Sequence, residues 1–197
     1  MKIFSLVYSN FAHLDKVFPD AQLIGPDDVV NHKISKGDIV IFHGGTDINA
    51  ALYGEVPSKY NDSPDHGRDA YEIDIYKECV EVGAFCLGIC RGAQLLCVLN
   101  GGKLIQHIAD GSHRMCNHEL TFTKDNLFYD RPITTNSDHH QAMLPSKEGV
   151  LIAYHKDICE MVWYPLTSTF CVQGHPEWLS DSEEFVVFVN NFIKEHM

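Results

Sequence analysis

The chain has 197 residues, 45% hydrophobic and 21% charged, which is enough for one buried core, so we expect a single domain over residues 1–197. Its 15 basic and 27 acidic residues give a formal net charge of -12, which disfavours nucleic acid or an anionic membrane as a partner. No run approaches the roughly 20 apolar residues of a membrane span, and no secretion signal is visible, so a soluble, cytoplasmic protein is expected.

Three short apolar runs in the first half of the chain are typical of buried parallel strands. They lie at residues 3–8, 38–42 and 84–87. A polar loop at residues 61–67 is followed by a predicted crossover helix over residues 69–82, where Ile73, Tyr76 and Val80 recur at helical spacing. Strands that alternate with helices indicate an α/β fold with a mainly parallel sheet.

The second half lacks long helices between its apolar runs, so we expect its strands to be antiparallel or to lie at sheet edges. These runs are residues 118–123, 150–154, 159–164 and 168–173. A closing helix is predicted over residues 181–196, behind a Ser180-Asp181 start. Its apolar residues at helical spacing are Phe185, Phe188, Val189 and Phe192.

The seven cysteines form an odd set without the spacing of a disulfide framework, so most are expected to be reduced. Five have apolar neighbours, where a free thiol behaves as a small hydrophobic side chain: Cys79, Cys86, Cys97, Cys159 and Cys171. Cys90 breaks that pattern.

The segment Gly88-Ile89-Cys90-Arg91-Gly92 predicts a nucleophile elbow, in which a strand turns sharply into a helix. Glycines on either side of the turn let strand and helix approach closely, and the turn lifts the reactive side chain above the sheet edge. By the motif alone, Cys90 could also be one more buried cysteine at a glycine-rich strand end.

The predicted helix start adds chemistry to Cys90. Unpaired N–H groups and the positive end of the helix dipole favour a thiolate, so we expect the pKa of Cys90 below its ordinary value of about 8.5. The N–H of Arg91 could receive the negative charge of a tetrahedral intermediate. Gly44 and Gly45, which follow the strand at residues 38–42, could supply a second backbone donor.

A second polar segment, His175-Pro176-Glu177, follows the apolar run at residues 168–173. The carboxyl edge of an open sheet is where catalytic groups collect. Proline pushes the preceding residue into an extended conformation, in which residues two apart point the same way, so Glu177 could orient the ring of His175. His175 would then be the base that takes the thiol proton, although a histidine satisfied at a strand end is the alternative.

These two motifs and four further stretches, in their order along the chain, resemble the class I glutamine amidotransferases. Within that family they resemble the gamma-glutamyl hydrolase-like branch, which cleaves gamma-glutamyl amides of amines such as aminobutyrate. The matching stretches span most of the chain: Gly44-Gly45-Thr46-Asp47, Tyr53-Gly54-Glu55, Arg68-Asp69 with Glu72, residues 87–94, residues 136–142 and residues 172–177.

The resemblance implies a flavodoxin-like three-layer fold, a Cys90-His175-Glu177 triad and a thioester intermediate. It also implies an oxyanion hole from the Arg91 amide and the Gly44-Gly45 loop. The α-amino and α-carboxylate ends of a glutamyl group would be held by Gln94, His139, His140 and Gln141. Asp138 stands where the hydrolase-like branch often has an apolar residue, which leaves the amine side of the substrate open.

No metal and no cofactor are expected. His113, Cys116 and His118 are residue types that can ligate a metal, but their spacing matches no closed zinc pattern and a fourth ligand is not evident. Phosphate-binding glycine loops are absent from the sequence, so no nucleotide is expected. His139 and His140 could also be a solvated loop pair.

The sequence is compatible with three functions. The leading one is hydrolysis of glutamine or a gamma-glutamyl amine by a free-standing cysteine hydrolase. The second keeps the chemistry but makes the chain an ammonia-supplying subunit for a separate synthetase. The third is a non-catalytic binding or regulatory module on the same fold.

Overall fold

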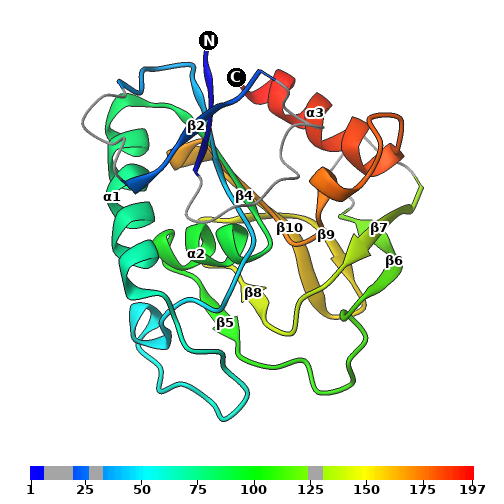
Figure 1. Cartoon of the computed structure of the whole chain (residues 1–197). Coiled ribbons are helices and arrows are strands. Elements are labelled where there is room, and N and C mark those ends of the chain that lie inside the picture. Colours follow the sequence, from blue (N-terminus) through cyan, green and yellow to red (C-terminus); the bar gives the residue numbers. More distant parts are fainter. Residues whose placement is uncertain (7–19, 27–32, 124–130) are drawn as a thin grey trace.

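A computed structural model describes residues 1–6, 20–26, 33–123 and 131–197 (Figure 1). The strands among them are β1 (Ile3–Leu6), β2 (Gln22–Ile24), β3 (Ile39–Phe42), β4 (Phe85–Ile89), β5 (Lys103–Ile105), β6 (Cys116–Phe122), β7 (Ile133–Ser137), β8 (Ala142–Leu144), β9 (Val150–His155), β10 (Ile158–Tyr164) and β11 (Thr169–Val172). The α-helices are α1 (His66–Val82), α2 (Arg91–Leu99) and α3 (Glu184–His196). Short 3-10 turns are η2 (Ala50–Tyr53), η3 (Pro165–Thr167) and η4 (Pro176–Trp178).

The strands form one mixed sheet in the order β2-β1-β3-β4-β11-β10-β9-β6-β7, and β8 pairs with both β10 and β5. The first five strands of that order are parallel, and the pairs beyond β11 are antiparallel. The strands predicted at residues 38–42 and 84–87 are confirmed as β3 and β4. The run predicted at residues 3–8 is β1, and its last two residues lie outside the described part of the chain.

The central strands are buried on both faces. In β3, Val40 and Phe42 pack in the cluster that contains α1 and α2 side chains, whereas Ile39 and Ile41 pack in the cluster that contains α3 side chains. Because side chains alternate along a strand, helices cover opposite faces of the sheet (Figure 1). The flavodoxin-like three-layer α/β fold is therefore confirmed.

The expectation that residues 168–173 form an antiparallel or edge strand is wrong in part. β11 lies in the middle of the sheet, parallel to β4 on one side and antiparallel to β10 on the other. The short turn η3 reverses the chain after β10, and β11 then occupies the place beside β4. Its four residues are buried on both faces, as is typical of a parallel strand. The other three runs are confirmed as β6, β9 and β10.

The helix predicted over residues 69–82 is present and begins earlier, at His66, behind an Asp65 side chain that accepts from the Arg68 N–H at 3.0 Å. Its predicted apolar face is wrong in part, because Tyr76 is buried and Ile73 is partly buried, but Val80 is 39% exposed. The buried face carries charged residues instead: Arg68, Asp69 and Glu72, with Ile75, Tyr76 and Cys79. The periodicity of apolar residues could not reveal a face whose charges are paired.

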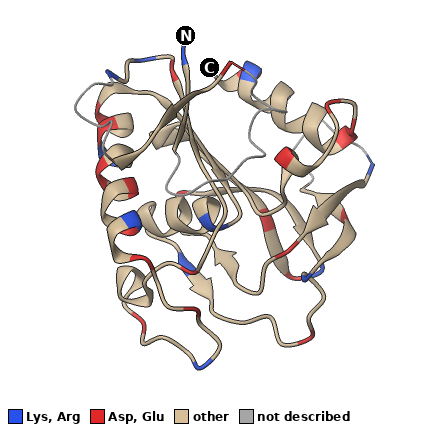
Figure 2. Cartoon of the chain, in the orientation of Figure 1, with Lys and Arg blue, Asp and Glu red and all other residues tan. Residues whose placement is uncertain are grey.

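The closing helix is confirmed as α3, with its four predicted apolar residues buried, but the predicted Ser180-Asp181 start is wrong, because the helix begins at Glu184 behind Glu183. The sequence did not reveal the short strands β2, β5, β7 and β8. Figure 2 shows the acidic residues spread along α1 and over the loops. Among the described residues, no helix is long and apolar enough to cross a membrane.

Candidate active site

Cys90 lies at the tip of a strained turn between β4 and α2. Its backbone has φ 51° and ψ -110°, a conformation that non-glycine residues rarely adopt. A Cβ atom on Gly92 would lie 2.1 Å from the Phe42 carbonyl oxygen, and one on Gly88 would lie 2.7 Å from the Ala93 backbone. The two glycines are therefore required for strand and helix to approach, as expected for a nucleophile elbow.

His175 and Glu177 follow β11 and point at each other. The Nδ1 atom of His175 lies 2.7 Å from Glu177 Oε1, and both side chains are buried. The backbone that brings Glu177 to His175 differs from the prediction of an extended segment. Glu177 lies in the turn η4, and this turn directs its carboxylate back to the ring of His175. His175 Nε2 has no hydrogen-bond partner among the described residues, so it remains available to a neighbour.

Cys90 and Glu177 affect the pKa of His175. Burial alone lowers the pKa of His175, but the nearby Cys90 and the Glu177 carboxylate more than offset this and raise it to about 10. A Cβ atom on Gly44 would lie 3.1 Å from His175 Cε1 and 3.5 Å from Cys90 Cβ, so Gly44 is packed against both side chains. The arrangement can hold a thiolate beside an imidazolium.

Trp178 covers the ring of His175. The two rings are parallel within 2°, with their centroids 3.8 Å apart, and Trp178 is half exposed. The sequence reasoning did not select this tryptophan, although it directly follows Glu177. The stack limits rotation of the imidazole while leaving Nδ1 to Glu177.

The Gly44-Gly45 loop is braced by buried ion pairs. Gly45 has φ +148°, and a Cβ atom there would lie 2.3 Å from Arg68 Nη1. Arg68 donates to Glu72 Oε1 at 2.7 Å and to the His43 carbonyl at 2.8 Å. The guanidinium of Arg91 binds both Glu72 and Asp69. The network therefore links α1, the loop and the elbow.

The groups predicted to form the oxyanion hole are neighbours of Cys90 in the chain or in space. Arg91 is the first residue of α2, and the first intrahelical bond runs from the Gln94 N–H to the Cys90 carbonyl at 3.0 Å. The amides of the first turn before Gln94 therefore have no acceptor within the helix. From the loop after β3, a Cβ atom on Gly44 would lie 3.5 Å from Cys90 Cβ, and Gly45 lines the same cavity as Cys90.

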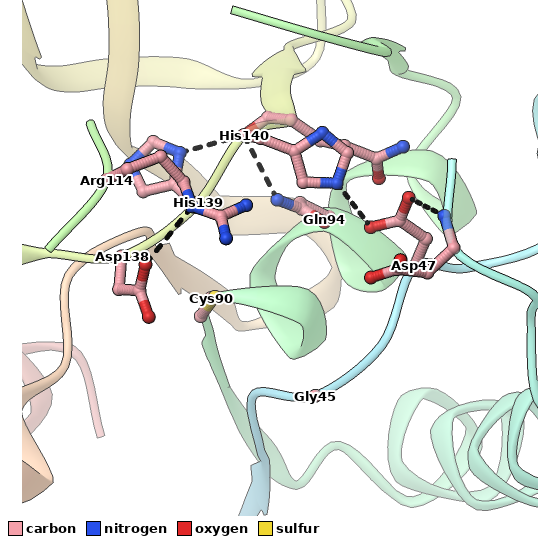
Figure 3. Close-up of a pocket in the computed structure, with 10 residues that line it drawn as sticks. Gly45, Asp47, Cys90, Gln94, Arg114, Asp138, His139 and His140 are labelled. Carbon is pink, nitrogen blue, oxygen red and sulfur yellow. Dashed lines mark hydrogen bonds and ion pairs between the residues drawn. The ribbon is translucent and has the colours of Figure 1, made fainter. Parts of the chain in front are cut away.

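A cavity of about 180 Å³ opens beside Cys90 (Figure 3). The predicted residues Gly45, Gln94, His139, His140 and Gln141 line it, together with four residues that were not assigned to the site from the sequence: Asp47, Asp62, Arg114 and Asp138.

The predicted substrate contacts differ in what they offer to the cavity. The Gln141 amide is buried, and neither its nitrogen nor its oxygen has a hydrogen-bond partner in the described residues. Gln94 Nε2 donates to the Gln141 carbonyl at 3.2 Å, which joins α2 to the loop before β8. His140 Nε2 lies 3.1 Å from Asp47 Oδ1, as Figure 3 shows. His139 instead directs Nδ1 to the Gln141 carbonyl at 2.8 Å.

Charged groups face one another across the cavity mouth. Arg114 Nε lies 3.4 Å from Asp138 Oδ1, and its side chain is more than half exposed (Figure 3). Asp138 and Asp47 therefore present carboxylates and Arg114 a cation, the groups that recognise an amino acid's charged ends. Two groups of side chains that could hold a metal ion also occur in the described residues: Asp47, Asp62 and His140, which line the cavity, and His113, Glu160 and the cavity residue His139.

Comparison with known proteins shows the family of the chain and proteins that share its fold. The family model described as Peptidase C26 matches residues 18–177. The "Putative glutamine amidotransferase-like protein YvdE" of Lactococcus lactis is 26% identical over 194 residues, covering 91% of this chain and 80% of the relative. The "Putative glutamine amidotransferase Rv2859c" of Mycobacterium tuberculosis is 35% identical over 153 residues, covering 70% of this chain and 50% of the relative.

A solved structure of a glutamine amidotransferase from Thermotoga maritima has a similar fold. It aligns with a TM-score of 0.64 at 14% identity, covering 100% of this chain and 86% of that chain. A putative GMP synthase component from Thermoplasma acidophilum aligns with a TM-score of 0.68 at 16% identity, covering 100% of this chain and 94% of that chain.

Proposed function

The chain belongs to the Peptidase C26 family of glutamine amidotransferase-like enzymes, which act on amide bonds, and we propose that it hydrolyses the gamma-glutamyl amide of glutamine or of a gamma-glutamyl amine. The observation that carries the proposal is the arrangement of three residues. Cys90 is raised on a strained elbow, and the adjacent His175 is held by Glu177 through its other ring nitrogen.

Each residue has one role in the proposed reaction. The Cys90 sulfur attacks the side-chain carbonyl carbon, and its proton goes to His175 Nε2. The negative oxygen of the tetrahedral intermediate accepts hydrogen bonds from the Arg91 amide and the Gly44-Gly45 loop. His175 then gives the proton to the leaving nitrogen, and the C–N bond breaks to leave a glutamyl thioester on Cys90.

Water completes the cycle. His175 takes a proton from a water molecule, which attacks the thioester carbonyl and forms a second tetrahedral intermediate. The C–S bond breaks, the thiolate recovers the proton from His175, and glutamate leaves. Glu177 stays ionised throughout and keeps Nε2 of the ring directed at the reacting atoms.

Recognition of the glutamyl group is proposed for the cavity of Figure 3. The unpartnered Gln141 amide can donate to the substrate's α-carboxylate, and Arg114 at the mouth can add a charge-assisted hydrogen bond. Gln94, His140 and the carboxylate of Asp47 would hold the α-amino end. Asp138, beyond Arg114, would favour a leaving amine that carries a positive charge.

The test measures glutamate release from glutamine and a panel of gamma-glutamyl amines. Cys90→Ala should abolish release while the circular dichroism spectrum is unchanged, whereas Cys116→Ser, a control at a partly exposed cysteine, should retain it. Retained activity in Cys90→Ala would exclude the assignment. Mass spectrometry of a rapidly quenched reaction should find a glutamyl adduct on Cys90.

The same experiment separates the other two functions. The fold likeness to a GMP synthase component makes an ammonia-supplying role the second candidate. Negligible release by the isolated chain that rises when a co-purifying synthetase is added would establish that role. Failure of every glutamyl electrophile to label Cys90 would leave a non-catalytic module.

A further inference from the structure

Four buried side chains converge behind the substrate cavity, outside the proposed catalytic residues. His118 lies on β6, Glu160 on β10, His113 in the loop before β6, and His139 in the loop between β7 and β8. Their exposed fractions range from 1% to 8%. Four ionisable groups are rarely buried together unless they are paired or hold a metal.

The ring nitrogens point at a single carboxylate oxygen. The Nε2 atoms of His113, His118 and His139 lie 3.1, 3.4 and 3.6 Å from Glu160 Oε1. None of these approaches has hydrogen-bond geometry, and neither the three Nε2 atoms nor either oxygen of Glu160 has a hydrogen-bond partner in the described residues. Such a set of unmet buried groups requires an explanation.

The tautomer of His139 is decided by its other nitrogen. His139 Nδ1 lies 2.8 Å from the Gln141 carbonyl oxygen, which can only accept, so Nδ1 carries the hydrogen. In the neutral ring, Nε2 then carries no hydrogen, and its lone pair faces the lone pairs of Glu160 Oε1. Two buried acceptors that face each other are stable only with a cation between them, either a second proton on His139 or a metal ion.

A metal ion accounts for more of the geometry than a proton does. One extra proton satisfies the His139 contact alone, whereas one ion can accept a lone pair from all four side chains. In a tetrahedral zinc site with bonds of about 2.0–2.1 Å, ligand atoms are roughly 3.3–3.4 Å apart, close to the distances from Glu160 to the three histidines. The donor atoms of His113, His139 and Glu160 all lie within 4.8 Å of one another, whereas those of His118 are close to Glu160 but fall outside this group.

The surrounding contacts also fit a metal site. Metal-bound histidines usually hydrogen bond through the second nitrogen, which sets the tautomer and the ring orientation. His139 Nδ1 has the Gln141 carbonyl, and His113 Nδ1 lies 2.8 Å from Ser112 Oγ.

We propose that His113, His139 and Glu160 bind one Zn²⁺ ion, and that His118, whose Nε2 already lies 3.4 Å from Glu160 Oε1, moves towards the ion to become the fourth ligand. Three imidazole nitrogens and a carboxylate oxygen form a donor set that zinc accepts, and four protein ligands leave no open position for a reacting water. The site is therefore structural. The sequence did not reveal it because the fourth ligand, Glu160, lies far along the chain, and Cys116, which has the right chemistry, turns its sulfur to the Ser112 carbonyl at 3.1 Å.

The ion would support the substrate cavity. It ties β6 and β10 to the loop that carries Asp138, His140 and Gln141, all of which line the cavity. Loss of the metal should therefore loosen the cavity wall and raise KM more than it lowers kcat, because Cys90 and His175 lie on other elements.

The experiment begins with the full chain, dialysed and analysed by inductively coupled plasma mass spectrometry. We expect about one zinc per chain. Chelator-treated protein should bind Co²⁺ with the visible absorption of a tetrahedral site, and Zn²⁺ should displace it and raise Tm. Glu160→Gln and His113→Gln should lose the zinc and the cobalt spectrum.

Two controls separate this site from its neighbours. Cys90→Ala should keep the zinc, which excludes metal bound at the catalytic residues. His155→Gln should keep it too, because His155 stacks on His118 but directs Nδ1 to the Glu119 carbonyl at 2.8 Å.

Zinc-free wild-type protein that neither binds Co²⁺ nor gains stability from Zn²⁺ would overturn the proposal, and a site that uses only protons would remain. Equal zinc loss in His155→Gln and Glu160→Gln would overturn the ligand assignment. The wild-type measurements hold even if a variant fails to fold.

Discussion

Asn136 holds the backbone of His175 at both of its polar groups. The Asn136 side chain accepts from the His175 N–H at 2.9 Å and donates to the His175 carbonyl at 2.9 Å. Asn136 lies on β7, at the far edge of the sheet order from β4, so this clamp connects the antiparallel half of the sheet to the base that serves Cys90.

Replacing Asn136 with Ala should lower kcat roughly 10- to 100-fold, because a displaced base is costly in a preorganised site. Loss of two hydrogen bonds should also lower the free energy of unfolding by about 1–3 kcal/mol. Steady-state kinetics and urea denaturation measure the two effects. Asn117→Ala is the matched control, since Asn117 pairs with Asn136 across the strands but is exposed, and it should change neither quantity. Unchanged kcat in Asn136→Ala would contradict the role.

Trp178→Ala should reduce kcat by roughly 2- to 10-fold, because an aromatic stack contributes about 0.5–1.5 kcal/mol to holding a ring in place. Its effect on Tm should be small, since Trp178 is half exposed. Trp178→Phe should recover most of the activity because it keeps a flat face over His175. If both variants behave like the wild type, the stack has no role in turnover.

The raised pKa of His175 predicts an alkaline limb in activity. The imidazolium must give a proton to the leaving nitrogen, so kcat/KM should fall as the pH rises through about 10. Cys90 and Glu177 both raise the pKa, and therefore Glu177→Gln should move the limb to lower pH. A pH profile of both proteins measures the shift, and an unmoved limb would show that another group causes it.

The same shift predicts a pH dependence of stability. A folded-state pKa above the ordinary value of 6.5 contributes stability that is fully present below pH 6.5 and is lost as the pH rises towards 10. Urea denaturation across this range should show the decline in the wild type and a smaller decline in Glu177→Gln. An equal decline in both would assign it to other groups.

Glu72→Gln should lower the free energy of unfolding by about 3–5 kcal/mol, because it leaves Arg68 and Arg91 without a shared buried carboxylate. The Gly45 loop rests on the same arginine, so activity should fall as well. Chemical denaturation measures the difference. Asp74→Asn, on the exposed side of the same helix, removes the ion pair with Lys77 and should change stability by less than about 0.5 kcal/mol.

The sequence alone determined the features that depend on neighbouring residues. The glycines around Cys90 allow only a tight strand-to-helix turn, and His175-Pro176-Glu177 places a carboxylate within reach of the ring whichever turn follows. The helices α2 and α3 and the strands β3 and β4 were predictable for the same reason, since their apolar patterns are local.

The tertiary structure alone decided what depends on residues far apart in the chain. β11 is a central strand because it pairs with β4 on one side and with β10 on the other. The buried face of α1 is charged because Arg91, from another helix, pairs with Glu72 and Asp69. The histidines and Glu160 of the proposed zinc site meet only when β6, β10 and the loop after β7 come together. A local sequence pattern cannot predict contacts between residues so far apart in the chain, because the packing of the whole sheet sets the distances between them.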